Sequence, residues 1–392
     1  INLESNLRKQ GYMVLNFSAQ KVEPPRMEIV KTKDYVFFSD GNCFPDELVE
    51  LLNNSTLHNS IVVSNVQETM GNNIIFSQEE LTEQTQSYLD GIDYQSLLEK
   101  LAYDLHVFGG FYLEIIRGKD KMYVADINHI PYEKIRANKM EDGEIKKYWY
   151  CDDWSQFRRK EYQPVEIPVY GSGEVREIYV YKRYSPKQYY YPLPTYVGAM
   201  KYIQIEAEIA NFHLSNILNG LNPGLVVFMK DSNTLTEDEK IEVERQIKKK
   251  FEGSDNTGKM ILMIGEEAPN VQQLTVSDLD KQFIALNEMI LQNILSAHRI
   301  TNPLLVGIKT AGELGGNAEL MNAYHLYFKK VISPAQRVIE DTLNEFLTIN
   351  GLSEIEIENE AILETQFTEQ TLTQILTVDE LREMIGYSNR NE

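Results

Sequence analysis

The chain has 392 residues, which is long enough to bury a sizeable core and to form two or more domains. Its formal net charge of −21 argues against a protein that reads nucleic acid through a basic face, and no apolar run is long enough to cross a bilayer. Cys43 and Cys151, far apart in sequence, offer neither a disulfide framework nor a metal-binding spacing, which favours a reducing compartment.

The first hundred residues predict an irregular arm followed by helices. Residues 1–35 show no hydrophobic period and are interpreted as an arm or edge segment. Apolar spacing predicts a helix from Pro45, a second over Asn59–Met70 and a third over Tyr94–Val107. The second contains a β-branched run that would suit a strand equally. Ile74–Phe76 is predicted to be a short strand.

A tyrosine-rich β region is expected from Gly109 to about Tyr190. Runs of β-branched and aromatic residues predict strands over 111–116, 122–125, 132–136, 146–151 and 177–181, the first two joined as a hairpin. Stacking on nucleic-acid bases would need basic residues between the tyrosines, and these are sparse. We therefore interpret the tyrosines as β-formers that pack inside the fold.

From Tyr189 to Arg299 the pattern predicts two long helices that lead to and from a small strand–helix–strand unit. The first helix, Lys201–Gly220, carries apolar residues at helical spacing. Two apolar runs, 225–229 and 260–264, predict strands on either side of a helix that begins with a capping box at Thr236. The return helix from Ser277 has two apolar stripes. This order indicates a projecting stalk with a tip, an arrangement typical of assembly rather than catalysis.

The C-terminal part combines a turn, a glycine-rich segment and a long helix. Ile300–Gly307 is predicted to be a turn, and Lys309–Asn317 contains three glycines. The helix predicted over Ala318–Ile349 contains Pro334, which should kink it. Beyond it, Glu354–Glu360 alternates with isoleucine as a strand does, and a short helix capped by Thr377 is expected near the end.

Patterns typical of catalysis are weak. The glycine-rich segment lacks the Gly-Lys-Ser/Thr ending of a phosphate-binding loop, and the six histidines are never at metal-ligand spacing. Asp152-Asp153 and the Glu354–Glu360 run could suggest carboxylate catalysis, but such residues more often lie on a solvated turn or strand. The sequence therefore predicts no enzyme, no metal and no cofactor.

Five stretches, in their order along the chain, resemble the portal proteins of tailed bacteriophages. They are Leu101–Glu114, Tyr191–Pro194, Leu225–Ile264, Ile300–Gly307 and Leu376–Arg382. The resemblance covers about Leu101 to Glu392, and more weakly Phe44 to Met70. At Tyr191–Pro194 the family usually has a turn that contains glycine, so the chain departs from the pattern there.

The resemblance implies a portal-like α+β fold with a mixed α/β wing, paired stem helices, a small αβ clip, a kinked tunnel helix and a C-terminal crown. The corresponding ranges are an arm (1–35), the wing (36–200 and 300–349), the stem helices (201–221 and 277–299), the clip (222–276), a tunnel loop (308–317) and the crown or C-terminal region (350–392).

The same resemblance implies a role in genome packaging and ejection. Family members form a homododecameric ring at one capsid vertex, beside the major capsid protein. A large terminase docked at the clip pumps double-stranded DNA through the ring without sequence specificity, and a head-completion or adaptor protein replaces it later. The expected location is the virion, with the host cytoplasm during assembly and no membrane.

Three sets of residues are expected to carry these contacts. The clip basic cluster, expected to contact the motor or adaptor, comprises Lys240, Arg245, Lys248, Lys249 and Lys250. The tunnel-loop set, expected to touch DNA weakly, comprises Lys309, Thr310, Gly312, Glu313, Gly315, Gly316 and Asn317. The stem set, expected between subunits, comprises Phe283, Ile284, Leu291 and Leu295.

Two other readings stay open. A different phage structural subunit, such as an adaptor or baseplate protein, would lack the stem–clip–stem order. A carboxylate-based hydrolase on an α+β scaffold would need a cleft with convergent acids. Negative-stain imaging distinguishes them, since only the portal predicts a mushroom-shaped ring with a central hole.

Overall fold

The computed structural model describes residues 27–28, 33–218, 226–230, 261–265, 279–308 and 317–359. The chain divides into two compact units. Unit 1 comprises Ile1–Pro24, Asn54–Thr56 and Ala199–Asn293, and unit 2 comprises Pro25–Asn53, Leu57–Gly198 and Ile294–Glu392. Unit 1 is thus mainly one long insertion, Ala199–Asn293, into the sequence of unit 2.

The helices that lie wholly or largely in unit 2 include the three predicted from its N-terminal sequence. They are α2 (Phe44–Asn54), α3 (Thr56–Met70), α4 (Thr82–Gly91), α5 (Tyr94–Val107), α9 (Asn317–Tyr327) and α10 (Ser333–Ile349). The β-branched run in α3 did not make it a strand, because Ile61, Val62 and Val66 lie on a buried face at helical spacing. Short 3₁₀ turns occur at 40–42, 79–81, 132–134, 160–162, 197–199 and 303–306.

The strands of unit 2 form small, mostly antiparallel sheets. Their bounds are β1 (Met27–Glu28), β2 (Phe37–Phe38), β3 (Asn73–Phe76), β4 (Gly110–Arg117), β5 (Val124–Ile130), β6 (Ile135–Ala137), β7 (Lys147–Tyr150), β8 (Val165–Pro168), β9 (Arg176–Lys182) and β12 (Ile355–Glu358). The sheets have the orders β5-β4-β9, β6-β7-β8, β12-β3 and β1-β2. The strand predicted in the acidic C-terminal run is confirmed, and it pairs with β3, with Ile355 opposite Phe76.

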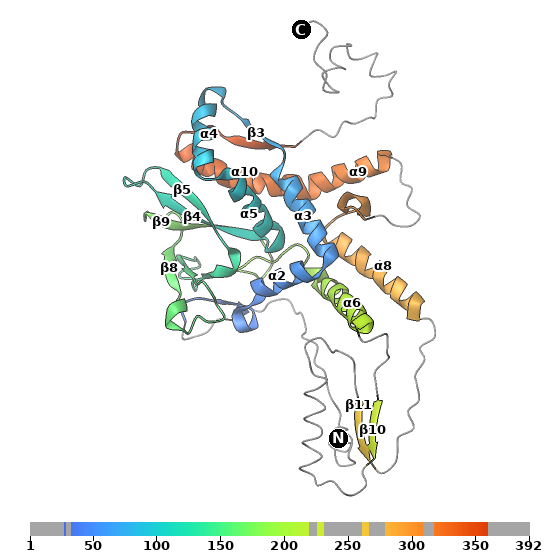
Figure 1. The fold of residues 1–392 in the computed structure, drawn as a ribbon. Helices are drawn as coiled ribbons and strands as arrows, with labels where there is room; N and C mark the ends of the chain where they lie inside the picture. Colours follow the sequence, from blue (N-terminus) through green and yellow to red (C-terminus); the bar gives the residue numbers. More distant parts are fainter. Residues whose placement is uncertain are drawn as a thin grey trace, which may run out of the picture. The chain divides into compact units, whose positions relative to one another are not determined.

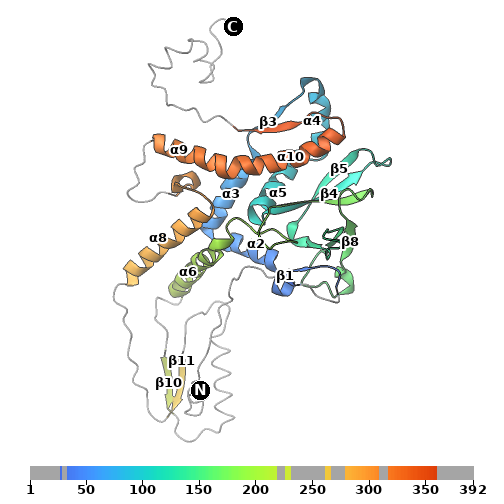
Figure 2. The ribbon, with the colours of Figure 1, turned by 180° about the vertical axis from the view of Figure 1, so that it is seen from behind.

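Helix α5 lies between α10 and the β5-β4-β9 sheet in both views of the ribbon (Figures 1 and 2). Leu97, Leu101 and Leu105 are almost completely buried on it. The helix then passes into β4 through Gly109, whose φ is +83°. A Cβ at this position would lie 2.7 Å from the carbonyl oxygen of Leu193, so both the conformation and the close approach require glycine.

Two sequence predictions need correction in the β region, and the predicted long helix contains a π-helical segment. The second hairpin strand begins at Val124 and runs to Ile130, later and longer than the predicted 122–125. The predicted strand over 132–136 is a 3₁₀ turn over Tyr132–Lys134, followed by β6. A π-helical segment, Phe328–Ile332, separates α9 from α10. The backbone stays right-handed helical from α9 through this segment into α10, so the long helix predicted over Ala318–Ile349 is confirmed, and Pro334 lies in its α10 part, just after the π-helical segment.

Unit 1 contains the predicted long helices and the two strands predicted between them. Helix α6 spans Met200–Leu218, and α8 spans Leu279–Ala297, the last residues of which belong to unit 2. Strands β10 (Val226–Lys230) and β11 (Ile261–Gly265) are confirmed and pair in parallel. Parallel neighbours require a crossover connection, which agrees with the strand–helix–strand prediction. The helix predicted between them lies outside the described residues.

Candidate functional site

The two long helices carry large apolar side chains on their surfaces. On α6, Ile205, Phe212 and Leu214 are 38%, 51% and 55% exposed. On α8, Ile284 and Met289 are 59% and 45% exposed. We call these five residues the stem surface. Because burying one such side chain is worth ~1.5–3 kcal/mol, a surface of this kind suits contact with another protein.

A shallow groove follows one face of α6. It is lined by Ile205, Glu208, Ile209 and Phe212 and encloses about 280 Å³. These residues recur at intervals of three and four, so their side chains lie one above the other along the helix. An apolar side chain from another helix could pack between them in the same way as in a helix bundle.

The structure treats the members of the predicted stem set differently. Ile284 is 59% exposed and available for contact, and Leu291 is half-buried. Leu295 is only 5% exposed, so it already packs inside the chain. The side chain of Phe283 lies outside those described. The sequence pattern showed that α8 has two apolar faces but could not show which of them the subunit itself covers.

The other two predicted sets lie mostly outside the described residues. The whole clip basic cluster lies between β10 and β11, in a part of the chain that the structure leaves undescribed. Of the tunnel-loop set, only Asn317 is described, as the first residue of α9. The contacts expected of both sets therefore stay predictions.

A buried histidine pair lies where α8 ends. His58 on α3 and His298, the residue after α8, approach through Nδ1 and Nε2 at 3.0 Å. The Tyr196 ring lies 4.3 Å from the His58 ring and 5.2 Å from the His298 ring, between ring centres. In a hydrogen bond between the two facing nitrogens, one donates and the other accepts, so only one of these two nitrogens carries a proton.

Burial keeps these histidines neutral. It lowers the pKa of His58 to about 3 and that of His298 to about 4, and for His58 the neighbouring His298 adds to the effect. His106 on α5, which contacts the Thr69 hydroxyl at 2.9 Å, also has its pKa lowered by burial, to about 3. Sequence reasoning missed this cluster, because no spacing connects histidines that are 240 residues apart.

The carboxylates that could suggest catalysis have local structural partners. Asp152 accepts a hydrogen bond from the Tyr150 hydroxyl, and Asp153 accepts from the backbone N–H of Ser155. Asp104, whose pKa burial raises to about 6, contacts His129 at 2.8 Å inside the fold.

Within the described ranges, no three His, Cys, Asp or Glu side chains gather as metal ligands would. Among the same residues, no helix combines the length and apolarity of a membrane span.

The arrangement of elements and the comparison with known proteins lead to the same family. The sequence profile of the phage portal protein family matches residues 86–386. The chain belongs to the phage portal protein family. The match includes both long helices, the clip strands and the final predicted helix, as the order of the resembling stretches indicated. Portal proteins are structural proteins rather than enzymes.

Individual relatives of this portal-family chain are distant. A probable portal protein of Haemophilus phage HP1 is 26% identical over 186 residues, which cover 46% of this chain and 52% of that protein. An uncharacterized protein of Rickettsia bellii is 24% identical over 216 residues, covering 52% and 54%. The aligned part thus spans about half the length of these curated relatives.

Solved structures confirm the α+β, portal-like fold class. A chain in the neck of an empty gene transfer agent particle, computed with C6 symmetry, has a TM-score of 0.55 and 14% identity, with 88% of this chain and 94% of that chain covered. A chain in the neck of the native particle, computed with C12 symmetry, has a TM-score of 0.53 and 16% identity, with the same coverage of both chains. At such identity the likeness shows the fold alone.

Proposed function

We propose that this chain is the subunit of a portal ring at one vertex of a phage or phage-like particle. The ring is a homododecamer that encloses a channel for double-stranded DNA during packaging and ejection. Membership of the portal family supports this proposal, as does the fold shared with the neck of a particle computed with C12 symmetry. The subunit acts by assembly and carries out no catalysis itself.

The observation that carries the ring is the stem surface. A ring closes through heterologous contacts, in which one face of each subunit meets a different face of the next. The exposed side chains on α6 and α8 provide apolar area on two helices of unit 1. In the ring we expect Ile284 and Leu291 of one subunit to pack against the α6 groove of its neighbour.

The channel and docking functions follow from the family. A channel that passes DNA of any sequence must avoid strong phosphate contacts, and a net charge of −21 suits that requirement. The tunnel-loop set would touch DNA weakly, while the clip basic cluster would bind the large terminase and later the head-completion protein. The major capsid protein would surround the ring in the virion, after assembly in the host cytoplasm.

The ring is tested by the mass of the purified chain, measured by native mass spectrometry and imaged by negative stain. We expect a ring with a central hole and the mass of twelve 45.3-kDa chains. The double variant Phe212→Glu/Ile284→Glu places charge on the stem surface and should leave monomers or small oligomers. The matched control Met122→Glu/Tyr184→Glu changes side chains of unit 2 that are 77% and 86% exposed and should leave the ring intact.

The test separates the alternatives as well. Monomers and dimers of the unaltered chain at every concentration would contradict the ring. An annular assembly that the stem variant does not disturb would instead show that other surfaces join the subunits. An adaptor or baseplate subunit predicts assemblies without the mushroom shape.

A further inference from the structure

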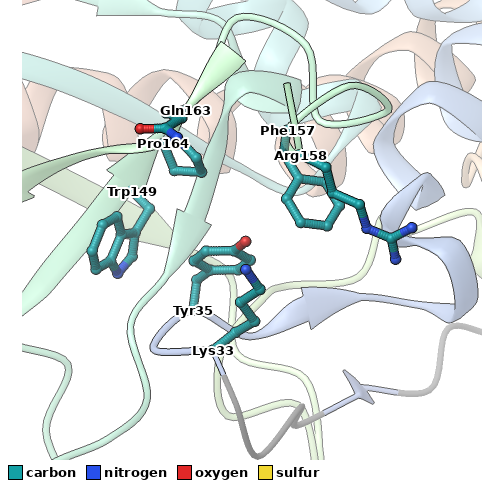
Figure 3. A pocket seen from close by; sticks show the side chains of 7 residues that line it. All are labelled: Lys33, Tyr35, Trp149, Phe157, Arg158, Gln163 and Pro164. Carbon is teal, nitrogen blue, oxygen red and sulfur yellow. The ribbon is translucent and has the colours of Figure 1, made fainter. Parts of the chain in front are cut away.

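A pocket in unit 2 has aromatic walls (Figure 3). Tyr35 precedes β2, Trp149 lies on β7, and Phe157 and Pro164 come from the segment between β7 and β8. Figure 3 shows Trp149 and Phe157 on opposite sides of Tyr35. The pocket encloses about 340 Å³, which is at the lower end of the range for small-ligand sites.

The aromatic walls are held in position from behind. Tyr35 packs edge-on against Trp149 and Phe157, with ring centres 5.8 Å and 6.1 Å apart. The Trp149 indole N–H donates to Asn138 Oδ1 at 2.9 Å, which fixes the ring, and Lys147 Nζ lies 5.8 Å from the centre of the same ring. Trp154 and Cys151 fill the space behind Tyr35 and are 5% and 1% exposed. A ligand would therefore find a preformed site and order few side chains on binding.

Two cations lie beside the Phe157 ring of the pocket. Lys33 Nζ is 5.6 Å from the centre of the Phe157 ring and 6.0 Å from that of Tyr35. Arg158 Cζ is 5.4 Å from the Phe157 ring centre. Neither forms an ion pair in the described part of the chain. Both are exposed, so an incoming anion can reach them.

Basic side chains outnumber carboxylates near the pocket, although Asp34 directly follows Lys33 and Glu161 directly follows Lys160. Glu166, opposite Trp149 in the β7–β8 pair, already binds Lys147 at 2.9 Å. Arg159 and Lys160 follow Arg158 directly and are exposed. An acidic ligand would relieve the repulsion between these cations, whereas a basic ligand would add to it.

We propose that this aromatic–basic pocket, formed by Lys33, Tyr35, Trp149, Phe157 and Arg158, binds a short acidic peptide segment of a partner protein. One aromatic or prolyl side chain packs against Trp149 and Phe157, whose rings flank the nearly buried Tyr35, as in other grooves lined by aromatic residues. Carboxylates on either side of it bind Lys33 and Arg158. This proposal does not depend on the assembly of the subunits into a portal ring.

A peptide fits the pocket better than DNA does. Affinity for DNA comes from neutralising many phosphates along the backbone, and the slope with salt reflects their number. The pocket offers two cations, on a chain whose net charge of −21 repels a long polyanion. A short segment with a few carboxylates meets those two charges and avoids most of the repulsion.

The test measures fluorescence anisotropy of the labelled hexapeptide Glu-Glu-Phe-Pro-Glu-Glu with the full chain. We expect saturable binding that weakens with added salt, at least about tenfold weaker binding of Glu-Glu-Ala-Ala-Glu-Glu, and none of Lys-Lys-Phe-Pro-Lys-Lys. The variant Lys33→Glu/Arg158→Glu should bind the first peptide at least about tenfold more weakly. The control Lys100→Glu/Lys119→Glu changes net charge equally at exposed lysines outside the pocket and should bind within about twofold of the unaltered chain.

A second variant tests the pocket without changing charge. Gln163→Trp fills the mouth of the pocket from an exposed position and should prevent binding while the thermal unfolding midpoint stays unchanged. Lack of saturable binding by the acidic peptide, or equal binding by both charge-reversed chains, would overturn the proposal. So would displacement of the peptide by thymidine monophosphate at lower concentration than by unlabelled peptide, since that result would assign the pocket to nucleotides.

Discussion

Acidification should destabilise unit 2 through its buried histidines, and the structure gives the size of the effect. His58, His106 and His298 have folded-state pKa values of about 3, 3 and 4, against an ordinary value of 6.5. Arg183 adds positive charge near His106 and opposes its protonation. Because the unfolded chain binds these protons more readily, the stabilisation is complete above pH 6.5, decreases steadily below pH 6.5 and is fully lost once the pH has fallen through the folded values.

The expected loss can be worked out for pH 5. That pH lies 1.5 units below the ordinary pKa of histidine, and each unit corresponds to about 1.4 kcal/mol. Each buried histidine therefore lowers the free energy of unfolding by about 2 kcal/mol at pH 5. The three together cost about 6 kcal/mol between pH 7.5 and pH 5. Asp104, with its pKa raised to about 6, acts in the opposite direction by about 1 kcal/mol over the same range.

Urea unfolding followed by tryptophan fluorescence measures this loss, because the only two tryptophans, Trp149 and Trp154, both lie in unit 2. The variants His58→Gln, His106→Gln and His298→Gln should each reduce the difference in unfolding free energy between pH 7.5 and pH 5 by about 2 kcal/mol. Comparing two pH values within one variant removes any general cost of the substitution.

His213→Gln serves as the control, since His213 lies on α6 in unit 1, whereas the two tryptophans report the unfolding of unit 2. The reasoning would be refuted if the double variant His58→Gln/His298→Gln kept the full pH dependence of the unaltered chain. That result would mean that the pair is solvated or already protonated in the folded protein.

Three further predictions concern the clip, the tunnel loop and the core. Reversing the charges of Arg245, Lys248, Lys249 and Lys250 should weaken the complex with terminase or adaptor and reduce its salt dependence, as measured by pull-down at increasing ionic strength. Replacing Gly312, Gly315 and Gly316 with alanine should leave rings intact but impair DNA packaging or retention, because the loop loses freedom; normal retention by a verifiably stiffened loop would contradict this. Arg136→Met should destabilise unit 2 by about 3–5 kcal/mol in urea, because this fully buried guanidinium donates to Asn42 and to the Glu133 carbonyl; a cost below about 1 kcal/mol would show that water replaces it.

Local patterns predicted the elements whose conformation depends on nearby residues. Helix α5, predicted from its apolar period, and strands β10 and β11, predicted from continuous apolar runs, are confirmed by the structure. The turn after α8 is confirmed in detail: the Asn302 side chain accepts from the Leu304 N–H, and Gly307 has φ +75°. The order of such stretches was sufficient to indicate the portal family. Predictions failed at strand boundaries such as 122–125, where pairing with a neighbour sets the length of the strand.

Contacts between distant parts of the chain depended on the tertiary structure alone. Ile355 pairs opposite Phe76, His58 meets His298, and Lys33 shares a pocket with Trp149 and Phe157. Hydrophobic periodicity describes the face of one element and contains no information about which other element covers it. The apolar faces of α8 illustrate this limit, because Ile284 and Leu295 have the same chemistry. Packing within the subunit buries Leu295 and leaves Ile284 exposed.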